Sequence, residues 1–536
     1  MASLLLVYVL LAPVAFGVLD ASSRSRWFSI AGSVSSLLAI AGLWLEGQPT
    51  VISLPLLPLS YGSQPVGLLL ASVTILVWLA ISIFSRHYLR YEHNSSRFIR
   101  LLSFSVAGAI SCFLARDFLA FLLGFELVSL ASQGLVGHHS HLETQQAARL
   151  YQRLGHLSGV ILIGGLAILA WQVNSLDYAQ LNGIPLGISL LLSIGFAIKA
   201  GAFPLHFWLP KAHPVAPSPA SALLSGILIK TGAYGILQVA SLTAAPATFG
   251  LILLVIALIT MGLGVVMALL QHDAKRMLAY HSVSQMGYIL LGIALWAFEH
   301  NALGLGGAVF HMINHAVFKS ALFLICGSAM LAANTTDIYR LGWLHQVFGL
   351  ATPLVLLPAL GIAGIPGFNG YISKTVLHSA LASSKLPPIL YRISDLVYIV
   401  VAFGTVCSFT KFSWFLFFAD RKGEDEAHQP AAKVEVLGIG LLSIVALLLG
   451  LFPQPVLDAL ASELTTLGAP LPPYLDLFSG HALQSAWLTL GGGLVLYCLC
   501  YYTGLFHPHA APLFSWNSLL KLVKPASKAG EVNHSK

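Results

Sequence analysis

The feature that most constrains this chain is a series of fifteen apolar runs, each about long enough to cross a bilayer. A transmembrane helix needs about 20 apolar residues. The chain has 536 residues, of which 57% are hydrophobic and 9% charged, whereas soluble proteins are about 25% charged. We therefore expect an all-α polytopic membrane protein with about 14–15 transmembrane helices. The runs are 2–20, 28–45, 66–85, 100–116, 118–137, 152–172, 186–208, 216–241, 248–270, 276–297, 303–332, 349–382, 393–419, 434–452 and 483–505.

Three of these runs are longer than a bilayer requires and contain glycine, proline or polar residues. Such runs are typical of transport proteins whose helices are interrupted near the membrane centre. We therefore expect broken helices there. The first run follows no basic segment and precedes no convincing cleavage site, so we expect it to be a retained span rather than a signal peptide.

The five cysteines all fall in apolar runs and none forms a CxxC pair. This pattern predicts no disulfide framework, iron–sulfur cluster or zinc site of cysteines. We expect no cofactor and no metal in the chain. The cysteines are Cys112, Cys326, Cys407, Cys498 and Cys500.

Lysine and arginine are unevenly shared between the two sets of loops. The loops after odd-numbered runs and the C-terminal tail hold 19 of the 27 basic residues, and the loops after even-numbered runs hold three: Arg116, Lys385 and Arg392. Cytoplasmic loops are enriched in lysine and arginine. We therefore expect the N-terminus outside and the C-terminus in the cytoplasm, in a prokaryotic cell membrane. The 19 are Arg24, Arg26, Arg86, Arg90, Arg97, Arg100, Arg149, Arg153, Lys211, Lys275, Arg276, Arg340, Arg421, Lys422, Lys433, Lys521, Lys524, Lys528 and Lys536.

The remaining five basic residues lie inside predicted spans, and all five are lysines: Lys199, Lys230, Lys319, Lys374 and Lys411. A charge inside a membrane costs about 2.5–3.5 kcal/mol on insertion scales, so it usually serves a function. A lysine can lose and regain its proton when its surroundings change, whereas an arginine stays protonated. The pattern predicts a proton relay; the alternative is snorkelling side chains or static ion pairs.

Two further observations support a relay. Among the acidic residues, only Glu126 lies clearly inside a span, where it could switch Lys199 between charged and neutral forms. Lys199 and Lys230 fall in spans seven and eight, and Lys374 and Lys411 in spans twelve and thirteen. Since the arrangement recurs five spans later, we expect two inverted five-helix repeats.

Several histidines extend this set. His311, His315 and Lys319 are spaced by four residues and share one helix face. Histidines can pass protons near neutral pH, so a relay is favoured for these two over ordinary core residues or metal ligands. His281, in an otherwise apolar span, is a packing or water-holding group that could join the relay. The five prolines between Pro204 and Pro219 exclude a regular helix, so we expect a cytoplasmic turn there.

Two loops carry histidines with open roles. His206 and His213, in the proline-rich turn, either feed protons from the cytoplasm or serve as structural residues at the interface. The segment "GHHSHLE" contributes His138, His139 and His141, which are either a metal site or a solvated loop.

Five segments resemble the proton-translocating antiporter-like subunits of respiratory complex I, Mrp-type antiporters and group 4 membrane-bound hydrogenases. The resemblance covers roughly residues 65–420. The segments are "FELVSL", "KAGAFPLHFWLPKAHPVAPSPASALLSGILIKTGAYGI", "DAKRMLAYHSVSQMGYI", "HMINHAVFKSALFL" and "GIPGFNGYISK".

The resemblance implies fourteen core helices, one broken helix in each repeat and a hydrated axis at mid-membrane. It implies that Glu126 and Lys199 are a coupled pair, that Lys230 is a relay lysine, and that Lys374 is the terminal residue. It further implies that His311, His315 and Lys319 connect the two halves.

The expected organisation follows from these assignments. Residues 1–99 form N-terminal transmembrane helices, 100–241 the first repeat, 248–419 the second, and 420–536 the C-terminal helices with a short cytoplasmic tail. The resemblance implies a non-redox translocating subunit of an oxidoreductase-type complex. Its implied partners are other membrane subunits and a peripheral cytoplasmic module, with protons as the transported ion.

Other functions fit the same sequence. One is an Mrp-type subunit that exchanges sodium for protons. Another is an ion-coupled subunit for the uptake of inorganic carbon or another solute. A third is a redox subunit that binds quinone, for which the sequence offers no cysteine cluster, haem histidine pair or nucleotide fingerprint.

Overall fold

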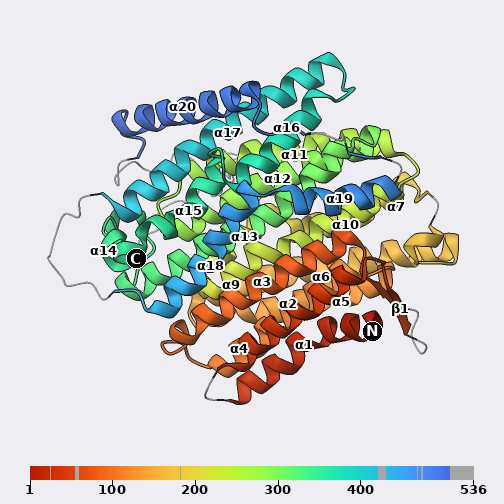
Figure 1. Cartoon of the computed structure of the whole chain (residues 1–536), viewed down its shortest axis with the longest axis horizontal. Helices are drawn as coiled ribbons and strands as arrows, with labels where there is room; N and C mark the ends of the chain where they lie inside the picture. Colours follow the sequence, from red (N-terminus) through yellow and green to blue (C-terminus); the bar gives the residue numbers. More distant parts are fainter. Residues whose placement is uncertain are drawn as a thin grey trace, which may run out of the picture.

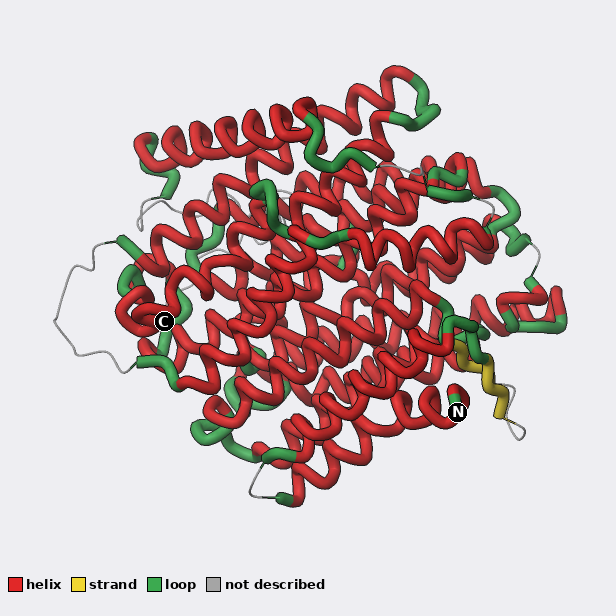
Figure 2. Tube along the Cα trace, in the orientation of Figure 1, coloured by secondary structure: helices red, strands yellow, loops and turns green. Residues whose placement is uncertain are grey.

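The computed structural model describes residues 1–23, 26–54, 59–181, 183–419, 430–467, 469–471 and 475–506. The expected cytoplasmic tail lies outside the described residues. The described chain is a bundle of helices (Figure 1, coloured along the sequence). A single hairpin accompanies them, in which β1 (Val51–Leu54) pairs antiparallel with β2 (Leu59–Gly62), and Figure 2 shows it at the margin of the bundle. The all-α expectation is confirmed.

Within the described residues, fifteen helical segments are long and apolar enough to cross a membrane, one for each predicted run. The chain is therefore a multi-pass membrane protein. The longer helices are α1 (Ala2–Ser22), α2 (Phe28–Glu46), α3 (Pro65–Tyr88), α4 (Ser95–Leu114), α5 (Phe118–Val136), α6 (Leu142–Val173), α7 (Leu186–Ala200), α10 (Ile229–Leu242), α11 (Pro246–Leu269), α12 (Ala274–Glu299), α13 (Ala302–Ala333), α15 (Thr352–Ala363), α16 (Asn369–Ala382), α17 (Pro388–Phe417), α18 (Lys433–Leu451), α19 (Gln454–Thr466) and α20 (Gly480–Tyr502). The shorter ones are α8 (Leu209–Val215), α9 (Ser218–Leu223) and α14 (Leu344–Phe348).

The seventh span is broken just after Lys199. Helix α7 ends at Gly201, whose φ of +67° suits glycine, and the chain resumes as a 3₁₀ turn (Leu205–Trp208) and α8. The expected turn between Pro204 and Pro219 is therefore wrong in part, because α8 and α9 fill most of it. Prolines are tolerated there because Pro210 and Pro219 lie in the first turns of these helices, where their missing N–H groups have no helical partner.

The twelfth span is also broken, as predicted. Gly364 (φ +85°) ends α15, Gly367 (φ +91°) completes the turn, and α16 begins at Asn369. The other two of the three longest predicted runs, 303–332 and 393–419, are continuous helices, α13 and α17. Their polar residues are accommodated by contacts with neighbouring helices, so breaks there are a wrong prediction.

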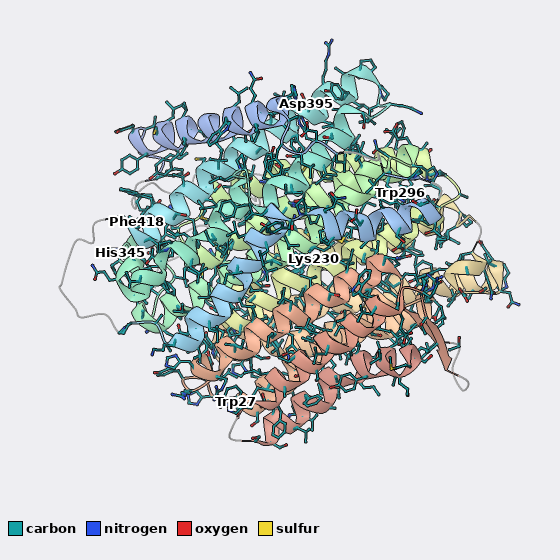
Figure 3. The ribbon with its side chains drawn as sticks, in the orientation of Figure 1. Trp27, Lys230, Trp296, His345, Asp395 and Phe418 are labelled. Atoms are coloured by element: carbon teal, nitrogen blue, oxygen red, sulfur yellow. The ribbon has the colours of Figure 1, made fainter. Side chains whose placement is uncertain are left out.

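The helices that carry the buried charges lie at the centre of the bundle. In the most apolar 18-residue stretch of Ser218–Leu242 and in that of α12, 100% of the residues are buried. In the corresponding stretch of α20, 22% are buried. Lys230 of α10 lies in the middle of the molecule (Figure 3). The peripheral helix α20 packs beside α17 (Figure 1).

Helix α19, which precedes α20, has a structural role at the start of α3. The Glu463 carboxylate accepts a hydrogen bond of 2.5 Å from the Val66 N–H. A carboxylate at a helix N-terminus satisfies a free donor and complements the helix dipole. Glu463 therefore fastens α19 to the bundle.

Candidate functional site: buried lysines and histidines

All five predicted intramembrane lysines are buried, with at most 8% of each exposed. Their hydrogen-bond acceptors are hydroxyl groups, backbone carbonyls and an imidazole. The four ion pairs among the described residues each join a histidine to a carboxylate, so none includes a lysine. Static ion pairs, one of the alternatives to a relay, are therefore not formed by these five lysines in the part of the chain that the structure describes.

Lys199, in the last turn of α7, points between α5 and α6. Its Nζ lies 3.0 Å from Ser129 Oγ and 2.8 Å from Tyr151 Oη. An adjoining cavity of about 10 Å³ is close to the volume that a single water needs, about 10–15 Å³. Two neutral hydroxyls therefore hold the amine.

Glu126 makes no ion pair with Lys199 in this structure. Its Oε1 is buried without a hydrogen-bond partner and lies against α6, where a Cβ added to Gly159 would be 2.5 Å away. The expected pair is not formed in this structure. Both residues lie beside α6, which packs against α5 and α7.

Lys230 contacts the second half of the chain directly. Its Nζ is in hydrogen-bond contact with His315 Nδ1 of α13 and donates to the carbonyl of Ser225 at 2.6 Å. Ser225 lies in a π-helical turn, Leu224–Leu228, between α9 and α10. Such turns often occur at functional sites.

The chain of contacts continues along α13 toward α16. The rings of His311 and His315 lie 6.4 Å apart, and His311 bonds Gln285 Oε1 at 3.1 Å and Ser373 Oγ at 2.9 Å. The Tyr288 ring lies 5.6 Å from the ring of His311 and 5.6 Å from Lys374 Nζ. The structure therefore places Lys230, His315, His311 and Lys374 in one buried row, with Tyr288 between His311 and Lys374.

Lys374 lies at the break of the twelfth span and at a cavity. Its Nζ donates to the carbonyl of Ile362, at the end of α15, over 2.7 Å. The cavity has a volume of about 200 Å³ and is lined by α15, α16, α17 and α20, including Tyr398 and His481. It extends from Gly364 to Ala382, toward the side with few loop lysines and arginines.

Lys319 and Lys411, both in the second half of the chain, donate hydrogen bonds to backbone carbonyls. Lys319 donates to the carbonyl of Leu278 in α12 at 2.7 Å. Lys411 donates to the carbonyls of Leu269 and Gln271 at 2.9 and 2.8 Å, at the end of α11, where a cation complements the helix dipole. Both ring nitrogens of His281 are buried and unpartnered, and its ring packs against Phe409.

His206 and His213 do not lie at the surface. They are 2% and 0% exposed, and their rings stack on Phe203 and Phe323. Both are therefore enclosed by protein, and their role in feeding protons from the cytoplasm stays a prediction. His213 has no hydrogen-bond partner on either nitrogen.

Four residues of this network are not evident from the sequence. Tyr151 and Ser373 look unremarkable there, and Gln285 resembles an ordinary packing and water-holding group. Lys275 falls in a predicted loop, but it is 2% exposed and donates to the carbonyl of Ala216. The sequence signal that could have placed Lys275 in a helix and not in a loop is Asp273, two residues before it, which caps α12.

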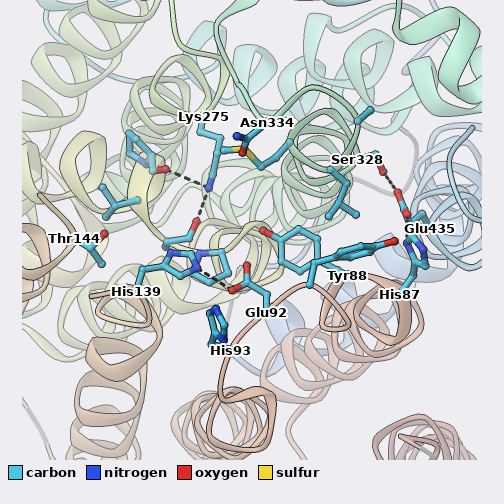
Figure 4. A pocket seen from close by; sticks show the side chains of 18 of the residues that line it. His87, Tyr88, Glu92, His93, His139, Thr144, Lys275, Ser328, Asn334 and Glu435 are labelled. Atoms are coloured by element: carbon cyan, nitrogen blue, oxygen red, sulfur yellow. Dashed lines mark hydrogen bonds and ion pairs between the residues drawn. The ribbon is translucent and has the colours of Figure 1, made fainter. Parts of the chain in front are cut away.

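A third cavity, of about 870 Å³, lies among loops that follow odd-numbered spans (Figure 4). Glu435 bonds His87 and Ser328 at one end, both at 2.5 Å. Glu92 bonds His139 at 2.8 Å at the other. Since these loops meet at one cavity, they lie on one side of the membrane, as the loop charges predicted.

In this third cavity, the shifted pKa values belong to Glu92 and the histidines beside it. The hydrogen bond with Glu92 raises the pKa of His139. Burial raises the pKa of Glu92, but the hydrogen bond and charge of His139 outweigh it, so the pKa lies below the usual value. Burial lowers the pKa of His138, whose Nε2 lies 3.6 Å from Glu92 Oε2. His141 lines the cavity but stays apart, with its ring 6.3 Å from that of His139.

The chain matches known proteins over most of its length. Residues 115–394 match the family described as NADH:quinone oxidoreductase/Mrp antiporter, TM. Hydrogenase-4 component B of Escherichia coli is 32% identical over 71% of this chain and 60% of its own length. A Na(+)/H(+) antiporter subunit of Alkalihalophilus pseudofirmus is 27% identical over 82% of this chain and 92% of its own length.

Two solved structures share the fold. A chain of the membrane-bound sulfane sulfur reductase, an archaeal respiratory membrane complex, superposes with a TM-score of 0.78 at 26% identity, covering 95% of this chain and 87% of the other. A chain of the Mrp complex from a Dietzia species superposes with a TM-score of 0.76 at 24% identity, covering 90% of this chain and 99% of the other.

Proposed function

Because the chain belongs to the NADH:quinone oxidoreductase/Mrp antiporter transmembrane family, we propose that it is a proton-translocating membrane subunit of a multisubunit energy-coupling complex. Relatives named as hydrogenase, formate hydrogenlyase and antiporter subunits support membrane subunits as partners. A peripheral cytoplasmic module that supplies the energy is part of the proposal.

The observation that carries this function is the buried row from Lys230 to Lys374. Lys230 touches His315, His311 bonds Ser373, and Lys374 faces a cavity of about 200 Å³. Each member can hold or release a proton or hydrogen-bond both ways. A proton entering at Lys230 therefore has to cross the gap between the two histidine rings, whose centroids lie 6.4 Å apart, and then the gap between His311 and Lys374. A water can bridge each gap.

The first half of the proposed proton route, from Lys199 to Lys230, is interrupted in this structure. Lys199 and Lys230 share no hydrogen bond, although α7 and α10 pack closely. Lys199 is held by Ser129 and Tyr151 while Glu126 is unpaired. Closing the Glu126–Lys199 pair stabilises the charged lysine, and opening it favours transfer of the proton toward Lys230.

The repeat and the orientation belong to the same proposal. Lys199 lies just before one break and Lys374 just after the other, in keeping with two inverted halves at 100–241 and 248–419. The bias of loop charges favours an outer N-terminus and a cytoplasmic C-terminus in a prokaryotic membrane. The cavity at Lys374 is then an outlet to the outer face.

Proton uptake by vesicles that hold the assembled complex tests this function. Lys230→Ala and Lys374→Ala should each abolish driven proton movement while the complex stays assembled. Lys385→Ala, at an exposed loop lysine, is the matched control and should pump normally. Full pumping by both buried variants would contradict the relay.

A second candidate is sodium–proton exchange. The Na(+)/H(+) antiporter subunit of Alkalihalophilus pseudofirmus aligns over 92% of its own length. Vesicles with a sodium gradient and an internal pH dye separate the two functions. A sodium-dependent pH change that Lys199→Ala removes favours exchange, and sodium-independent pumping favours proton translocation alone.

A further inference from the structure

At the wall of the wide cavity among the loops after the odd-numbered spans, three side chains that could bind a metal lie close together, and two of them line the cavity. Glu92 comes from the loop between α3 and α4, and His138 and His139 come from the loop between α5 and α6. One ligand atom of each lies within 4.8 Å of the other two. Four ligands arranged tetrahedrally around zinc at about 2.1 Å lie about 3.4 Å from one another. Small side-chain movements would therefore bring the three into coordination.

The strongest sign of a missing ligand is His138. Its side chain is 1% exposed and neither ring nitrogen has a partner at ordinary hydrogen-bond distance. Its contacts are an ion pair between Nε2 and Glu92 Oε2 at 3.6 Å and a hydrogen-bonding influence of the His93 backbone. Buried polar groups are almost always hydrogen-bonded, so a buried imidazole with only these long contacts has room for a closer ligand.

The three side chains differ in exposure in the way an open metal site requires. The Glu92 side chain is 11% exposed and that of His139 is 32% exposed, and both line the cavity of about 870 Å³. His138 lies behind them. Figure 4 shows His139 and Glu92 pointing toward each other at the cavity wall. A hydrated ion can reach the site from the cavity, and a water can take the fourth position.

We propose that Glu92, His138 and His139 bind a divalent transition metal of the zinc class, which joins the α3–α4 loop to the α5–α6 loop. Two imidazoles and one carboxylate with an open position suit zinc and its neighbours rather than magnesium or calcium, which take oxygen ligands. The bound metal replaces the Glu92–His139 hydrogen bond and gives His138 a partner. The proposed site departs from the expectation of no metal: it uses His138 and His139 of the histidine-rich loop together with Glu92 and leaves out His141.

Cobalt substitution tests the site in the full-length chain. The protein is purified through a tag without histidine, stripped with a chelator and titrated with Co²⁺. The wild type should show the visible ligand-field bands of four-coordinate Co²⁺ at one equivalent, and one equivalent of Zn²⁺ should remove them. His138→Ala and Glu92→Gln should each weaken binding at least about tenfold, as expected for the loss of one ligand.

His141→Ala is the matched control, because it removes a histidine of the same loop and should leave the bands unchanged. Melting in chelator gives each protein its own metal-free baseline, and relative to that baseline only the wild type and His141→Ala should gain stability with Zn²⁺. Absence of the bands in the wild type, or bands that persist in His138→Ala, would overturn the proposal.

Discussion

Lys199 Nζ donates a hydrogen bond of 2.8 Å to the hydroxyl of Tyr151, across the interface between α7 and α6. The Tyr151 hydroxyl in turn lies 2.6 Å from Ser132 Oγ of α5. Tyr151 therefore links Lys199, at the break of the seventh span, to both α6 and α5.

Removing this hydroxyl should alter transport without unfolding the chain. Tyr151→Phe keeps the ring, which also contacts Trp208, and deletes one acceptor of Lys199. A hydrogen bond to a charged group contributes about 1.5–3 kcal/mol, so proton uptake should fall about tenfold or more. The measurement is uptake by vesicles that hold equal amounts of assembled complex, and an unchanged rate would show that Tyr151 does not position Lys199.

The contact between α7 and α10 should be sensitive to added volume. A Cβ at Gly232 would lie 2.5 Å from the backbone of Phe196 and Ala200. Overpacking costs about 1–3 kcal/mol, so Gly232→Val should lower the melting temperature in detergent. Gly262→Ala on α11, where a Cβ meets nothing within 4 Å, should leave it unchanged. Equal melting of the two variants would argue against the close packing of α7 and α10.

Hydropathy alone was enough to predict the number of spans and the burial of the five lysines, because both follow from the cost of polar groups in a bilayer. The break at Gly364 and Gly367 was also predictable from glycine and proline. By contrast, Glu92 is far from His138 in sequence, and only the packing of two loops brings them together. The polar residues of α13 were misleading, since neighbouring helices satisfy them without a break.

The orientation is a separate prediction. A reporter that is active only in the cytoplasm, fused after Lys536, should be active. The same reporter fused after Thr466, between the last two spans, should be inactive, because that loop contains no lysine or arginine. Activity at Thr466 together with inactivity at Lys536 would reverse the orientation and make the cavity at Lys374 an inlet.

The central claim is that Lys199 must give up its proton, and Lys199→Arg tests it most directly. Arginine keeps the charge and the hydrogen-bond donors but stays protonated. The measurement is proton uptake by vesicles that hold the assembled complex, with Lys385→Arg as the matched control. The relay predicts that Lys199→Arg assembles but takes up no protons, while the control pumps normally. Normal uptake by Lys199→Arg would show that the charge is structural and would contradict the relay.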